Sequence, residues 1–190
     1  MQKACGGGGC SADHGNAGGR GCNAERGNAG GGCSADCGNT CGRDEYFMRE
    51  ALKCARRAAA KGEAPVGAVV VKDGVIIARA RNEREARQDA TLHAEMTAIR
   101  RACKKIGLWR LVGCDIYVTL EPCPMCAGAI VLARLDRLVY GAADPKAGAC
   151  GTVIDVICAP GLNHHPEVSA GVLRGECAAL LTAFFRGLRK

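Results

Sequence analysis

The chain has 190 residues, 48% of them apolar, which is enough for one domain of ordinary size with a hydrophobic core. Lysine and arginine outnumber aspartate and glutamate by 26 to 19, and the resulting net charge of +7 suits a polyanionic partner. The apolar stretch from Ala127 to Leu135 is interrupted by Arg134 and is far shorter than the roughly 20 residues that cross a bilayer, so we expect no membrane-spanning segment.

Cysteine is abundant, with 14 residues in the chain. In a small secreted domain this abundance would indicate disulfides. The stretch from Met1 to Asp13, however, has no apolar core that a signal peptide requires. We therefore expect the reducing environment of the cytoplasm.

Residues 1–43 differ in composition from the rest of the chain. They hold 14 of the 27 glycines and 6 of the 14 cysteines, and the string Cys10–Asp13 returns in degenerate form as Cys22–Glu25 and Cys33–Asp36. A segment with so few large apolar side chains cannot form a packed core, which predicts a disordered extension. A metal- or redox-responsive tail is the alternative, because thiolates bind soft metals. Residues 44–190 are then the folded domain.

The predicted elements begin with a helix from Asp44, because an acidic residue can cap a helix and the apolar positions that follow have helical spacing as far as Gly62. Two β-rich runs follow at 66–71 and 75–80. Residues 72–74, a Lys-Asp-Gly turn signal, predict that the two runs form a hairpin.

Strands and helices alternate in the rest of the chain, which favours an α/β sheet covered by helices. The proline in the first turn of the third predicted helix suits that position. The expected elements are a helix from about 92 to 107, a strand at 116–120, a helix at 124–135, a strand at 138–140 and a helix from about 176 to 186.

Two short strings carry the chemistry, His93-Ala94-Glu95 and Pro122–Cys126. Together they supply three zinc ligands, His93, Cys123 and Cys126. Catalytic zinc has three protein ligands and an open position for water, whereas structural zinc is closed by four. Zinc lowers the pKa of its water toward neutrality, and helix N-termini favour the thiolate form of nearby cysteines. We therefore predict one catalytic zinc ion in each subunit.

Glu95 is the candidate general acid and base. Two residues beyond His93 on a helix, its side chain would point away by about 200 degrees, so it reaches the metal only if the string occupies the first turn. The combination of His-x-Glu with Pro-Cys-x-x-Cys resembles the signature of the zinc-dependent nucleobase deaminases. That resemblance implies that the Glu95 carboxyl group takes a proton from water, delivers it to a ring nitrogen and passes it to the departing ammonia.

Other interpretations of the cysteines and histidines are open. A cysteine-rich chain can produce coincidental pairs, and Cys103 or Cys114 could close a structural zinc site as a fourth ligand, although neither stands in a second close cysteine pair. His164 and His165 are adjacent. We expect these two histidines at most to contact the zinc ligands, and not to bind the metal themselves.

Over residues 44–190 the chain resembles the bacterial tRNA adenosine deaminases of the cytidine/deoxycytidylate deaminase superfamily, which convert the wobble adenosine to inosine. The zinc strings are shared across the superfamily, and further strings narrow the resemblance. These are Asp44–Met48, Ala64–Ala68, Thr119–Gly128, Gly161–His164 and Glu176–Leu181.

The resemblance implies roles for residues outside the zinc strings. Asn82 matches an asparagine that contacts the target base, and Asp144 matches an acidic residue near the ribose. Asn163 and His164 would hold a neighbouring nucleotide. Each also has a structural explanation: Asn82 can end a strand, for example, and Asp144 before a proline can begin a turn.

The resemblance also implies a three-layer α/β/α sandwich with a central mixed sheet, a cytidine deaminase-like fold. The expected partners are the anticodon loop of tRNA and a second copy of the chain in a homodimer. Three alternatives remain: a free-base guanine or cytosine deaminase, a noncatalytic RNA-binding subunit, and a thiol-rich metal buffer centred on the tail.

Overall fold

A computed structural model describes residues 37–188, with side chains from residue 42 onward; the predicted extension lies mostly outside these residues. Five helices and five strands are present in the described part of the chain. In chain order they are α1 (Cys37–Ala59), β1 (Gly67–Lys72), β2 (Val75–Arg81), α2 (Arg84–Arg87), α3 (Ala94–Ile106), β3 (Cys114–Leu120), α4 (Pro124–Leu132), β4 (Arg137–Ala142), β5 (Glu167–Ala170) and α5 (Arg174–Gly187).

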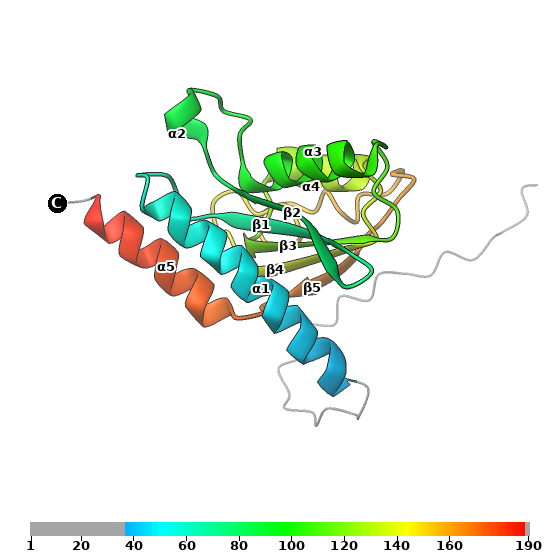
Figure 1. The fold of residues 1–190 in the computed structure, drawn as a ribbon, viewed down its shortest axis with the longest axis horizontal. Coiled ribbons are helices and arrows are strands. Elements are labelled where there is room, and N and C mark those ends of the chain that lie inside the picture. The colour runs from blue at the N-terminus through cyan, green and yellow to red at the C-terminus, as the bar shows by residue number, and fades with distance from the viewer. Residues whose placement is uncertain (1–36, 189–190) are drawn as a thin grey trace, which may run out of the picture. The chain divides into compact units, whose positions relative to one another are not determined.

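The strands form one mixed sheet in the order β2-β1-β3-β4-β5. Strand β1 is antiparallel to both of its neighbours, whereas β3, β4 and β5 run parallel. Helices α3 and α4 lie on one face of the sheet, and α1 and α5 lie on the other (Figure 1). The predicted three-layer α/β/α sandwich is therefore confirmed.

Alternation along the strands supplies a core to each face of the sheet. On β1, Val70 belongs to the core on the α3 side of the sheet, whereas Val69 and Val71 belong to the core on the α1 side. On β3, Tyr117 is buried on the α1 side and its neighbours on the other. Successive side chains of a strand point to opposite faces, so apolar residues at every position predict a sheet covered on both sides.

The predicted hairpin is confirmed. Lys72 pairs with Val75, and the two residues between them, Asp73 and Gly74, have φ angles of 49° and 75°. Positive φ at both central positions is the requirement of a tight hairpin turn whose twist matches the strands, and the Asp-Gly pair meets it.

The predicted start of the first helix was wrong. Helix α1 begins at Cys37, and Asp44 lies inside it, 5% exposed, instead of capping it. The Asp44 carboxylate accepts hydrogen bonds from Tyr117 on β3 and Arg137 on β4. Aspartate often caps a helix, but Asp44 instead neutralises the partly buried Arg137, and its partners lie far along the chain.

Two short elements were not predicted. Helix α2 has four residues and no buried side chain. Strand β5 has four largely exposed residues at the edge of the sheet. Neither carries the apolar periodicity from which the others were predicted. No helix in the described range 37–188 has the length and apolar character needed to cross a membrane.

Candidate active site

One edge of the sheet gathers the ends of four strands. The register places the end of β2, the start of β1 and the carboxyl ends of β3 and β4 side by side. Two helices begin there: His93 is the residue before α3, and Cys123 is the residue before α4. Ligands in α/β folds bind outside the carboxyl ends of the parallel strands, and the two motifs meet at this position.

The backbone at both helix starts is extended, with φ and ψ of −70° and 155° at His93 and −73° and 171° at Cys123. Pro124 follows as the first residue of α4, where its fixed φ suits the helix and its missing N–H costs no hydrogen bond. Cys126 comes in the first turn of α4. Both cysteines and the histidine are therefore held at helix N-termini.

These three side chains form a group that can hold a metal ion, with their ligand atoms within 4.8 Å of one another. The Sγ atoms of Cys123 and Cys126 each lie 3.6 Å from Nδ1 of His93. Zn–N and Zn–S bonds of about 2.05 and 2.3 Å at a tetrahedral angle separate nitrogen from sulfur by about 3.5 Å. The donor set and both distances thus fit zinc.

The pKa values of the two thiols are shifted in opposite directions. The hydrogen bond from Cys126 lowers the pKa of Cys123 to about 4, and the same interaction together with burial raises the pKa of Cys126. The hydrogen bond with Cys123 also raises the pKa of His93. A thiolate beside a histidine is a metal-binding environment.

Glu95 lies in the first turn of α3 and is 3% exposed. Because His93 precedes the helix, the 200-degree separation expected for a helix does not apply, and both side chains reach the same site. The Glu95 carboxyl group hydrogen-bonds with the Cys126 thiol, while its Oε2 atom is buried without a hydrogen-bond partner. Burial raises the pKa of Glu95 to about 7. Such a group is suited to exchanging protons with a ligand.

Asn82 directly follows β2 and is 5% exposed. Its Oδ1 atom accepts a hydrogen bond of 2.9 Å from the backbone N–H of Ala94. This bond ties the sheet edge to the first residue of α3, next to His93. The structure therefore places Asn82 beside the metal-binding group.

Asp144 follows β4 at the same edge, in a segment that Glu121 holds. The backbone N–H of Asp144 donates to Oε2 of Glu121 over 3.0 Å, and Glu121 lies two residues before Cys123. Sequence reasoning included Glu121 in a matching string but assigned it no role. The available signal was an acidic residue between an apolar strand and the cysteine pair.

Asn163 and His164 lie elsewhere. His164 Nε2 is 2.6 Å from the carbonyl oxygen of Leu135, and Arg134 donates to the carbonyl oxygen of Asn163 over 3.0 Å. Both contacts follow the C-terminus of α4, whose nine residues span about 13 Å at 1.5 Å per residue. Within one chain, the structure does not bring this pair to the metal-binding group.

The alternative ligands do not join the group either. Cys103 donates to the carbonyl oxygen of Trp109 and Cys114 to that of Val112. His165 Nδ1 lies 2.9 Å from the carbonyl oxygen of Ile157. Among residues 37–188, the metal-binding group has three ligands, which is the number typical of a catalytic site.

Comparisons with known proteins agree with this chemistry. A family model of MafB19-like deaminases matches residues 43–189. The tRNA-specific adenosine deaminase of Bacillus subtilis (strain 168) is 55% identical over 148 residues, which cover 78% of this chain and 92% of that protein.

Two solved structures are also similar. One, from a study of A-to-I editing by tRNA:A34 deaminases at the wobble position of transfer RNA, has a TM-score of 0.70 and 48% identity, covering 72% of this chain and 99% of that one. A guanine deaminase from Nitrosomonas europaea has a TM-score of 0.65 and 26% identity, covering 74% and 83%. This chain therefore belongs to the MafB19-like deaminase family, and its sequence is similar to that of a tRNA-specific adenosine deaminase.

Proposed function

We propose that this enzyme converts adenosine to inosine at the wobble position of tRNA, with adenosine and water giving inosine and ammonia. The observation that carries the proposal is a three-ligand metal-binding group with the buried carboxyl group of Glu95 beside it. The 55% identity to a tRNA-specific adenosine deaminase supports the choice of substrate.

His93, Cys123 and Cys126 would hold one zinc ion in each subunit. Bound zinc acts as a Lewis acid and makes water a stronger nucleophile at neutral pH. The protein contributes the helix N-termini, which stabilise the thiolates, and a buried position in which Cys126 is 0% exposed. These features exclude bulk water from one side of the site.

Glu95 moves the protons. Its carboxylate takes a proton from the attacking water, delivers it to a ring nitrogen of the base and assists the departure of ammonia. Burial and the unpartnered Oε2 atom leave the group free to make these bonds with substrate. No structural hydrogen bond of that oxygen has to break first.

Asn82 and Asp144 would bind the target nucleotide. Asn82 uses its carbonyl oxygen to hold Ala94, so its amide N–H₂ group is the part that contacts the base. Asp144 lies at the same sheet edge, where its carboxylate would accept from a ribose hydroxyl. The adenosine must leave the base stack to reach the site, and a single-stranded anticodon loop permits this.

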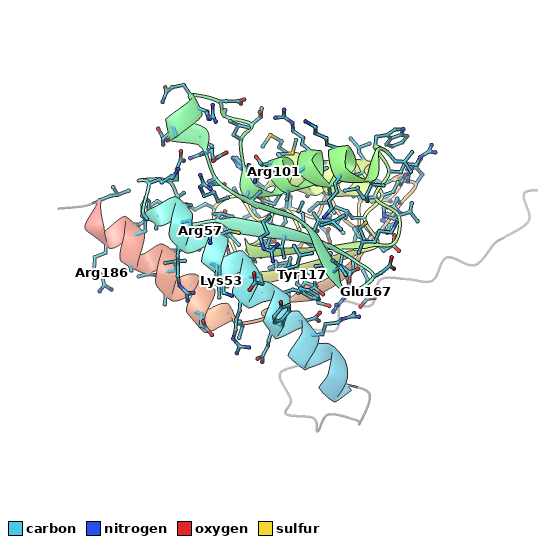
Figure 2. All side chains as sticks on the ribbon, in the orientation of Figure 1. Lys53, Arg57, Arg101, Tyr117, Glu167 and Arg186 are labelled. Atoms are coloured by element: carbon cyan, nitrogen blue, oxygen red, sulfur yellow. The ribbon has the colours of Figure 1, made fainter. Side chains whose placement is uncertain are left out.

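Positive charge beside the site supports an RNA substrate. An open hollow of about 440 Å³ lies between α3 and the segment before it. Figure 2 shows Arg101, one of its lining residues, on the α3 layer, whereas Lys53 and Arg57 lie on α1 across the sheet. Positive charge predominates among its charged lining residues, which are Arg87, Arg100, Arg101 and Lys104 on one side of the balance and Glu83 and Asp89 on the other.

A homodimer would account for Asn163 and His164. Leu132, at the end of α4, is 71% exposed, and Arg134, two residues later, holds Asn163. If a second copy of the chain covered Leu132, Asn163 and His164 of the first copy would lie near the substrate site of the second. Because tRNA is the proposed substrate, we also propose that the enzyme acts in the cytoplasm.

The test is incubation of the purified protein with tRNA transcripts, followed by mapping of inosine. We expect inosine at position 34 in transcripts with adenosine there and none in transcripts with guanosine there. The Glu95→Ala variant is the control for contaminating activity.

The similarity to guanine deaminase makes a free-base deaminase the second candidate. Release of ammonia from free guanine or cytosine, without inosine in tRNA, would favour it. Binding of tRNA without either reaction would favour a noncatalytic RNA-binding subunit.

A further inference from the structure

Glu121 has no part in the proton transfers above, yet its carboxylate is 2% exposed and fully engaged. Oε2 accepts a hydrogen bond from the backbone N–H of Asp144 over 3.0 Å. Oε1 accepts from the N–H of Cys150 over 3.0 Å and from that of Thr152 over 3.2 Å. One side chain therefore holds both ends of the segment 144–152.

The same segment is attached at its middle. Gly148 donates to the carbonyl oxygen of Asp144 over 2.9 Å, and Ala149 donates to that of Pro122 over 2.9 Å. Pro122 lies between Glu121 and the ligand Cys123. The segment thus wraps around the Glu121 carboxylate and lies against the chain that enters the metal-binding group.

Gly148 provides the space for this arrangement. A Cβ atom at this position would overlap the Glu121 carboxylate and would lie 2.6 Å from the carbonyl oxygen of Asp144. Any larger residue must displace the carboxylate or the segment. Close packing therefore restricts which residue types fit at position 121 and at position 148.

Glu121 is itself rigidly placed. Its backbone N–H donates to the carbonyl oxygen of Ala142 over 2.8 Å, which continues the pairing of β3 with β4. The Asp144 side chain accepts from the N–H of Lys146 over 2.9 Å, a local turn that sets its orientation within the segment. The position of Asp144 relative to the site then depends on the hydrogen bond from its backbone N–H to Glu121.

We propose that Glu121 is a positioning residue that fixes Asp144 against the ribose of the target nucleotide by holding three backbone N–H groups of the segment 144–152. The inference rests on the proposed function, in which Asp144 contacts substrate. A carboxylate suits the task because both oxygens accept and neither donates. An amide would turn an N–H₂ group toward at least one backbone N–H.

The first experiment combines substitutions. We expect Glu121→Gln to raise the KM for tRNA about tenfold, the effect of one lost charge-assisted hydrogen bond, with kcat changed less than about threefold. In an Asp144→Ala background the same substitution should change KM less than about twofold, because its effect passes through Asp144. Independent, multiplying effects would overturn the proposal, as would loss of zinc from Glu121→Gln.

The second experiment does not require activity. Amide hydrogen exchange at Asp144, Cys150 and Thr152 should accelerate in Glu121→Gln and in Gly148→Ala. Glu63→Gln is the matched control, because Glu63 is likewise buried and accepts backbone N–H groups, those of Glu85 and Ala86, but does not contact this segment, so these amides should stay unchanged. Unchanged exchange in both test variants would refute the positioning role. If exchange accelerates in both test variants but the parent protein does not deaminate tRNA, the anchoring role of Glu121 stands and the proposed function is refuted instead.

Discussion

Arg137 and Asp44 form a bidentate ion pair, with Nη1 2.8 Å from Oδ1 and Nη2 2.7 Å from Oδ2. The hydroxyl group of Tyr117 donates to the same Oδ1 atom over 2.8 Å. The side chains of the pair are 16% and 7% exposed. Since Asp44 is on α1 and Arg137 begins β4, the pair joins a covering helix to the sheet.

Removal of one partner should therefore be costly. We expect Asp44→Ala to lower the free energy of unfolding by about 3 kcal/mol, the low end for a buried pair, because the partly buried guanidinium group keeps only the exposed carboxylate of Glu167 beside it. Urea denaturation measures this. The control is Glu45→Ala, which breaks the exposed pair with Arg49 and should cost less than about 1 kcal/mol. Equal losses in the two variants would contradict the structural role of Asp44.

The metal-binding group gives a stoichiometric prediction. The full chain should contain one more equivalent of zinc than its Cys123→Ala variant, since two remaining ligands cannot hold the ion tightly. Elemental analysis after dialysis checks this. Cys114→Ala is the control, because the Cys114 thiol donates to the carbonyl oxygen of Val112 and does not belong to the metal-binding group. This variant should keep the zinc content of the parent. Equal zinc in the Cys123 variant and the parent would argue against the site.

Glu95 should be required for turnover and dispensable for metal binding. We expect Glu95→Gln to lower the single-turnover rate by 10²- to 10⁴-fold, the usual contribution of a positioned general acid and base. Zinc content and the urea midpoint should stay close to those of the parent, because Oε2 has no hydrogen-bond partner to lose. A rate within about tenfold of the parent would mean that another group moves the protons.

The basic hollow beside α3 should contribute to tRNA affinity. We expect the double variant Arg100→Ala, Lys104→Ala to bind tRNA more weakly and to lower the slope of log K against log salt by about 1.5, because two phosphate contacts are lost. Binding measured across a salt series checks this.

The matched control is Lys53→Ala, Arg57→Ala on α1, across the sheet (Figure 2). It removes the same charge. If both variants shift the slope equally, net charge accounts for the effect and the hollow is not a specific contact.

Local patterns predicted the elements that carry the chemistry. The hairpin at Asp73 and Gly74 depends on two neighbouring residues, and the start of α4 depends on Pro124, so each can be recognised without the rest of the fold. The same reasoning failed at Asp44. Its partner Arg137 is 93 positions away, and a capping residue cannot be told from a buried ion-pair partner by its neighbours.

Residue type and short spacing were enough to identify the metal ligands and Glu95, because zinc binding depends on donor chemistry and Cys123 and Cys126 share one helical turn. The role of Glu121 was decided only by the folded chain, since the N–H groups that it accepts come from residues 23, 29 and 31 positions later. The placement of His164 at the far end of α4 was decided in the same way. Backbone donors carry no signature of residue type, and long-range packing alone brings them to a carboxylate.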